Sequence, residues 1–285
     1  MESSKLLRRR LALAALAVLA ALLSVTAATY AWYVYNTTAR TTRVEMAAGS
    51  SVSLQISNTE AGPYRSSTVM EDFTGRLVPV STDKISGGFQ LVEEFATVET
   101  QNSNVYRLVA SIFGPGVEAV HYYKTSLYLR TNSNQLNIYL SDIGYEDGDP
   151  TNPISTAMRL GLVVQGQEYI FAINTDPNPN ADDNAAKEPE GGYVLRHDMT
   201  DGSTVPFTPY TSANFCNYDT QTGVVTVPAG AVSFCTVSGD GHGGYGEPVK
   251  LDIYLWLEGC DEDCTLNLMG QTMKNVALAF AGFAG

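Results

Sequence analysis

Four cysteines have the most readily identified chemistry in this chain: Cys216, Cys235, Cys260 and Cys264. An even number favours disulfides if the chain lies outside the cytoplasm, and four cysteines allow three pairings. We expect the local pairs 216–235 and 260–264, because the first pair flanks a Gly/Thr-rich segment that can fold back on itself. The alternative is a zinc site that adds His242 to Cys260 and Cys264, although nothing in their spacing requires it.

Oxygen donors recur within the acidic segment 174–192, NTDPNPNADDNAAKEPEGG, at Asp176, Asn178, Asn180 and Asp182. Calcium prefers such donors, so these residues are candidate calcium ligands. The central Gly and the late Glu of an EF-hand loop are absent, and two prolines restrict the shape of the segment. The open alternative is a solvated acidic loop that binds no cofactor.

No catalytic motif accompanies these residues. The sequence contains no H-E-x-x-H, G-x-S-x-G or G-K-[ST] pattern, and its only histidines are His121, His197 and His242. The glycines of SGDGHGG match G-x-G-x-x-G, but the run that follows, VKLDIYLWL, alternates as a strand. A dinucleotide site needs a helix there, so this match predicts a turn. We therefore predict that the chain is not an enzyme.

Two aromatic residues near the C-terminus, Tyr254 and Trp256, are candidates for a carbohydrate-binding face. They occupy alternate positions of one run, on the opposite side from Leu251, Ile253 and Leu255. Aromatic rings bind sugars by stacking, which makes a glycan a candidate partner. The alternative is that both rings cover the outer face of a sheet or an interface.

The strands that position these residues are predicted where apolar and polar residues alternate over a short run. Such runs lie at 51–57, 105–113, 125–130, 135–140, 158–164, 168–173, 223–227, 232–237, 249–257 and 275–280. Acidic, turn-rich segments at 141–153, 174–192 and 238–248 are expected to be exposed loops. About ten strands without a helical period predict an all-β fold, a single antiparallel β-sandwich or jelly-roll-like domain.

The first 31 residues have a different character. Lys5 and three arginines precede the apolar run LALAALAVLAALLSVTAATYA, and the small residues Thr29 and Ala31, at positions −3 and −1, permit cleavage between Ala31 and Trp32. This pattern predicts an N-terminal hydrophobic signal helix, residues 1–31, followed by an extracellular domain, residues 32–285. The alternative is an uncleaved membrane anchor with an interfacial aromatic belt. Both interpretations include membrane contact through this segment and place the domain outside the cytoplasm.

The charge of the chain narrows the choice of partner. The whole chain carries a formal net charge of −13, and cleavage before Trp32 would make it −16 by removing four basic residues and one acidic residue. Such a charge repels nucleic acid and anionic lipid. We expect no nucleic-acid partner.

The leader and its exit, RRRLALAALAVLAALLSVTAATYAWYVYNTT, resemble those of the camelysin/TasA group. This group comprises exported surface and biofilm-matrix proteins of Gram-positive bacteria, whose leaders end in T-[YW]-A before an aromatic residue. The segments TAMRLGLVVQGQEYIF (156–171) and VKLDIYLWLEGCDEDC (249–264) look like those of uncharacterised exported proteins of Firmicutes.

The resemblance to the camelysin/TasA group implies a jelly-roll-like body, leader removal by a dedicated signal peptidase, and fibres in which one subunit donates its N-terminal strand to the next. On this chain the cut falls before Trp32, and residues 32–44 would be the donor strand. Camelysin is described as a metalloprotease, but this chain has no metal-ligand motif to carry that activity. The acidic loops and the four cysteines depart from the fibre-forming group.

These observations lead to one hypothesis and two alternatives. The hypothesis is an exported structural protein of the cell surface or matrix that self-associates, with fibre formation by strand donation. The alternatives are a surface adhesin or carbohydrate-binding module, and a membrane-anchored β-sandwich of unknown ligand.

Overall fold

The computed structural model describes residues 39–48, 54–70, 77–99, 106–174, 193–198, 202–261, 263–264, 268 and 271–284. Only the backbone is described at 39–48, 93–99 and 106–113. The described residues form β-strands and three short 3-10 helices, with no α-helix among them, so the chain is an all-β protein. Within the same residues no helix has the length and apolar character needed to cross a membrane.

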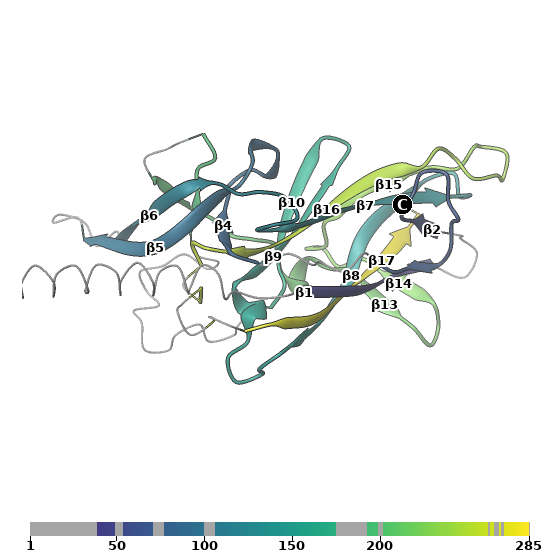
Figure 1. Cartoon of the computed structure of the whole chain (residues 1–285). Coiled ribbons are helices and arrows are strands. Elements are labelled where there is room, and N and C mark those ends of the chain that lie inside the picture. The colour runs from purple at the N-terminus through teal and green to yellow at the C-terminus, as the bar shows by residue number, and fades with distance from the viewer. Residues whose placement is uncertain are drawn as a thin grey trace, which may run out of the picture. The chain divides into compact units, whose positions relative to one another are not determined.

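Figure 1 shows the described elements in their order along the chain. In chain order they are β1 (Ala39–Ala48), β2 (Leu54–Ser57), β3 (Ser67–Thr68), β4 (Pro79–Ser81), η1 (Ile85–Gly87), β5 (Gln90–Glu99), β6 (Tyr106–Pro115), β7 (Tyr123–Thr131), β8 (Leu136–Asp147), η2 (Ile154–Ala157), β9 (Met158–Val164), β10 (Gln167–Ala172), β11 (Tyr193–Leu195), β12 (Thr204–Pro206), η3 (Ser212–Asn214), β13 (Asn217–Asp219), β14 (Val224–Thr226), β15 (Ser233–Val237), β16 (Val249–Glu258) and β17 (Met273–Phe283).

Two large sheets organise these strands. The five-stranded sheet has the order β15-β8-β17-β1-β3. The eight-stranded sheet has the order β10-β9-β16-β4-β5-β6, and β7 pairs with β16 and β2 beside this path. Most pairs are antiparallel, as predicted, but β1 lies parallel to β17 and β4 parallel to β16. A purely antiparallel arrangement is therefore wrong for these two pairs.

The main core combines side chains from both sheets. The alternating residues Leu251, Ile253 and Leu255 of β16 are fully buried in it, together with Leu278 and Phe280 of β17. Alternation of this kind places one side of each strand in the core. Burial of each such side chain contributes about 1.5–3 kcal/mol, so the rows along β16 and β17 specify the register of both sheets.

The alternating runs miss several strands, among them β5, and they also miss the end of β8. The segment 141–153 is expected to be an exposed loop, but β8 continues to Asp147, which pairs with Met273. The long strand β17 supplies the backbone partners for this extension. Strand β5 is also absent from the predicted set, because its pairing with β6 shifts register between Leu91 and Phe95 and this interrupts the alternation.

The outer side of β16 is covered by a second, smaller layer. Trp256 is fully buried there, with its ring centroid 5.1 Å from that of Phe89 in an edge-to-face arrangement. A Cβ atom at Gly161 would lie 2.5 Å from Cδ1 of Ile85 and 2.9 Å from the Trp256 ring. Only glycine leaves room for the η1 segment to pack this closely against β9 and β16.

Candidate functional site

The four cysteines, all within the described residues, are free thiols, so the predicted disulfides are wrong. Cys235 lies in the main core, whereas Cys216 packs with Tyr139 and Ala281. Tyr139 alternates along β8 with the core residues Ile138 and Leu140. Cys216 and Cys235 therefore lie on opposite faces of the five-stranded sheet, which prevents a bond between them.

Cys260 and Cys264 also belong to separate parts of the interior. Cys260 packs with Val92, Tyr193 and Leu195, and Cys264 lies in the main core. Burial raises the pKa of both thiols well above the usual value, and neighbouring carboxylates add to the shift. Neither thiol has the thiolate character of a metal ligand or a nucleophile.

The predicted zinc site is not formed either. No group of three or more His, Cys, Asp and Glu side chains in the described part of the chain is arranged to hold a metal ion. His242 lies in an exposed turn, where its backbone N–H donates to Asp240 Oδ1 over 2.7 Å. The calcium candidates Asp176, Asn178, Asn180 and Asp182 lie outside the described residues, as do Ala31 and Trp32.

The predicted carbohydrate face lacks one of its two rings. Trp256 is fully buried, and its indole N–H donates to Glu258 Oε2 over 3.0 Å, so the ring does not reach the surface. Tyr254 is half-buried, and the Lys124 ammonium lies 5.4 Å from its ring centroid. Lys124 also forms an ion pair with Glu118 over 3.2 Å. The alternative interpretation, that Trp256 covers the outer face of the sheet, is the one observed.

A buried polar cluster follows β16 and has no sequence motif. Glu258 accepts hydrogen bonds from the Trp256 indole and from the Cys260 backbone N–H, the latter over 3.1 Å. Burial raises the pKa of Glu258 to about 7, because removal from water disfavours its charged form. Nearby, the buried Arg159 is bound by Asp261. The cluster is enclosed by protein, which makes it an internal support of the β16 turn.

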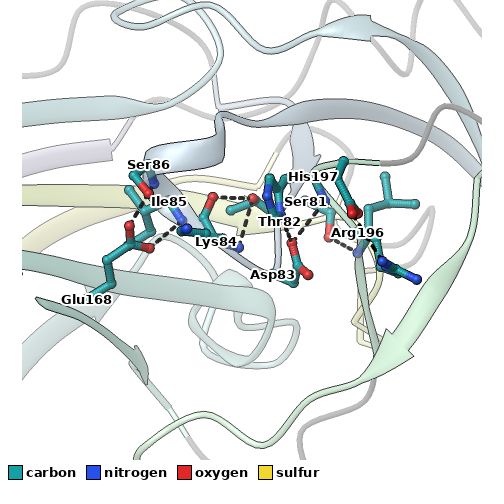
Figure 2. A network of polar contacts seen from close by, with 11 residues as sticks. Ser81, Thr82, Asp83, Lys84, Ile85, Ser86, Glu168, Arg196 and His197 are labelled. Atoms are coloured by element: carbon teal, nitrogen blue, oxygen red, sulfur yellow. Dashed lines mark hydrogen bonds and ion pairs between the residues drawn. The ribbon is translucent and has the colours of Figure 1, made fainter.

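A second network links η1 to distant strands (Figure 2). The imidazole Nδ1 of His197 lies 2.6 Å from Asp83 Oδ1, which also accepts the His197 backbone N–H over 2.9 Å. On the other side of η1, the Glu168 carboxylate accepts the backbone N–H groups of Ile85 and Ser86 over 2.7 and 3.0 Å. Both contacts hold the 81–87 segment against the sheet.

An aspartate that orients a histidine is also a component of catalytic triads. Such a triad needs a hydroxyl or thiol bound to the same imidazole. No described hydroxyl or thiol forms a hydrogen bond with His197. The pair lies 114 residues apart in the sequence, and for this reason no local motif could reveal it. Its role in the described structure is to fasten the segment after β11 beside η1.

One edge of the five-stranded sheet, formed by β1 and β3, offers a different kind of site. Strand β1 runs parallel to β17 from the pair Ala39–Met273 to the pair Ala48–Gly282, and Figure 1 shows the two strands side by side. On its other side the one described partner of β1 is β3, through Val44–Thr68 and Glu45–Ser67. The sheet therefore ends on a long strand with a short cover, and this edge is the candidate site for association with another chain.

Comparison of the chain with protein-family models, with curated proteins and with solved structures found no match.

Proposed function

We propose that this chain is an exported structural protein of the cell surface or extracellular matrix, which assembles with copies of itself by exchanging its first strand. The observation that carries the proposal is the position of β1. This strand lies next to the edge of its sheet, where the two-residue strand β3 covers it, and it pairs along its length with β17, the last described strand. The predicted cleavage before Trp32 would place β1 near the new N-terminus, and a segment there can leave such a position without unthreading the rest of the fold.

The backbone chemistry of the exchange is symmetrical. The hydrogen bonds that β1 makes with β17 of its own chain can be made equally by β1 of a second copy. Register places Val44 beside Leu278 and Met46 beside Phe280, two buried core residues. A donated strand in this register would restore the same sheet, so the exchange conserves the interactions of the folded domain.

Export belongs to the same proposal. Cleavage before Trp32 would leave residues 32–38 ahead of β1, which extends the segment available for donation. The body would be a jelly-roll-like sandwich that carries this N-terminal arm. The acidic composition agrees with solubility outside the cell and disfavours nucleic-acid binding.

Strand donation can be tested with the mature chain, residues 32–285, and a variant that lacks residues 32–48. We expect polymers of the intact chain by electron microscopy and none of the truncated variant. A synthetic peptide of residues 39–48 should bind the truncated variant and raise its melting temperature, because it restores the partner of β17. A peptide of the same composition in scrambled order is the control. Polymers that persist after truncation, or an intact chain that stays monomeric, would overturn the proposal.

A further inference from the structure

The segment 54–70, here called the clasp, connects the two large sheets across the edge occupied by β1. It begins as β2, which pairs with β7 of the eight-stranded sheet from Leu54–Thr131 to Ser57–Tyr128. It ends as β3, which pairs with β1 of the five-stranded sheet. One short segment thus reaches from a fixed strand to the only described cover of the β1 edge.

The first half of the clasp is firmly anchored. The Arg130 guanidinium of β7 lies between two rings, 3.9 Å from the Tyr64 centroid and 4.3 Å from the Tyr245 centroid. Its Nε and Nη2 donate to Gln55 Oε1 over 3.0 and 2.9 Å. Ile56 and Arg65 exchange two backbone hydrogen bonds of 2.8 and 3.0 Å. These contacts tie the turn of the clasp to the eight-stranded sheet.

One polar side chain, Asn58, bonds the β3 end of the clasp. Asn58 Nδ2 donates to the backbone carbonyl of Val69 over 2.8 Å, and its Oδ1 accepts the Thr68 hydroxyl over 2.8 Å. The Val69 side chain is 60% exposed, whereas the next residue, Met70, is buried in the main core, so the chain beyond β3 is fixed there and the half-buried β3 residues are not. Asn58 therefore joins the anchored half of the clasp to Thr68, one of the two residues that pair with β1, and to Val69 beside it.

Strand β1 pairs with β17 over a longer stretch than with β3. Eight register pairs join it to β17, but two join it to β3. We propose that the clasp is a latch, in which Asn58 holds β3 against β1 and thereby controls how readily β1 leaves its own sheet. The inference rests on the proposed strand donation for its consequence, which is that the latch sets the rate of assembly.

The latch is tested first in the mature monomer by hydrogen exchange of the β1 amides followed by mass spectrometry. Loss of the Asn58 hydrogen bonds in Asn58→Ala should increase exchange of residues 39–48 about fivefold to tenfold. The matched control is Asn214→Ala, at a site distant in sequence from the clasp. The Asn214 side chain makes the same kind of bonds as Asn58, because its Nδ2 donates to the Gly230 carbonyl and its Oδ1 accepts the Thr211 backbone N–H. Equal β1 exchange in the two variants would overturn the latch.

A second variant is designed to attach β3 more firmly to β1. Glu45 and Ser67 face one another in the antiparallel pair of β1 and β3, and cysteines at such positions fall within disulfide range. Oxidised Glu45→Cys/Ser67→Cys should show slower β1 exchange and slower polymer growth than wild type, and dithiothreitol should restore both rates. Exchange that responds to the variants without polymers from any of them supports the latch and overturns strand donation. Polymer growth at one rate in all variants overturns the latch and leaves strand donation intact.

Discussion

Glu258 makes the stability of this protein depend on pH in a direction unusual for a carboxylate. Its side chain is fully buried at the end of β16, with hydrogen bonds from the Trp256 indole and the Cys260 backbone. Burial raises its pKa from 4.5 to about 7, while the Arg159 charge and the hydrogen bonds oppose the shift. The folded protein therefore retains a proton on Glu258 over a range where the unfolded chain has released it.

The sign and size of the effect follow from this difference. Below pH 4.5 Glu258 is protonated in both the folded and the unfolded protein, and its contribution to the free energy of unfolding is fully present. As pH rises from about 4.5 to about 7 the unfolded chain binds fewer protons than the folded protein, so stability falls. A difference of about 2.5 pH units corresponds to roughly 3 kcal/mol, which is lost by about pH 8.

Urea unfolding at half-unit steps from pH 5 to pH 8.5 measures this dependence. We expect Glu258→Gln to remove the fall of roughly 3 kcal/mol, although the amide cannot accept every hydrogen bond and lowers stability at pH 5 by about 1–2 kcal/mol. Burial lowers the pKa of His121, which gives an opposite slope below its ordinary value of 6.5. The comparison of variant with wild type cancels that contribution.

The matched control for Glu258 is Glu146→Gln. The Glu146 side chain is 61% exposed and pairs with Lys274 at the surface, where an ion pair contributes about 0–1 kcal/mol. Its unfolding curve should follow wild type at every pH. If Glu258→Gln keeps the wild-type fall in stability between pH 5 and pH 8, the assignment of this effect to the buried carboxyl is refuted.

Two further predictions concern the interior. Gly161→Ala should destabilise the fold by about 1–3 kcal/mol, because the new methyl group overlaps Ile85 and Trp256; in Gly144→Ala, where the nearest atom lies 3.5 Å from the new Cβ, the change should stay within about 0.5 kcal/mol. Equal melting temperatures would contradict the close packing. Since burial raises the pKa of all four cysteine thiols, iodoacetamide should label none in the native protein and four in denaturant without reductant. Fewer than four labels in denaturant would reveal a disulfide.

Periodicity identified the strands that have one face in the core. The prediction of 158–164 coincides with β9, and that of 249–257 falls one residue short of β16. Both strands are flanked by other strands on two sides, and their leucines leave a clear period of two. The all-β class follows from such strands, because their alternation depends only on local spacing and on which face is buried.

The candidate sites were harder to predict, because they depend on what covers an outer face. The alternation of β16 correctly separates Trp256 from the leucines. It contains no information on Phe89 and Ile85, which lie about 170 residues away and bury the indole. The same limit applies to Asp83 and His197, since their pairing arises only when η1 and the segment after β11 come together. Spacing along a strand cannot reveal a partner supplied by a distant segment.

The pairing of the first and last strands connects folding to assembly. The contact between β1 and β17 spans more than 200 residues of chain, so its loop-closure entropy is among the largest in the fold. Contacts of such separation form after local hairpins such as β5–β6 and β9–β10. Under the proposed strand donation, the β17 edge is open during that interval to β1 of its own chain or of another, and local concentration would decide between them. Among the described strands β3 of the clasp pairs only with β1, so under the proposed latch the clasp would close after this choice and then preserve it.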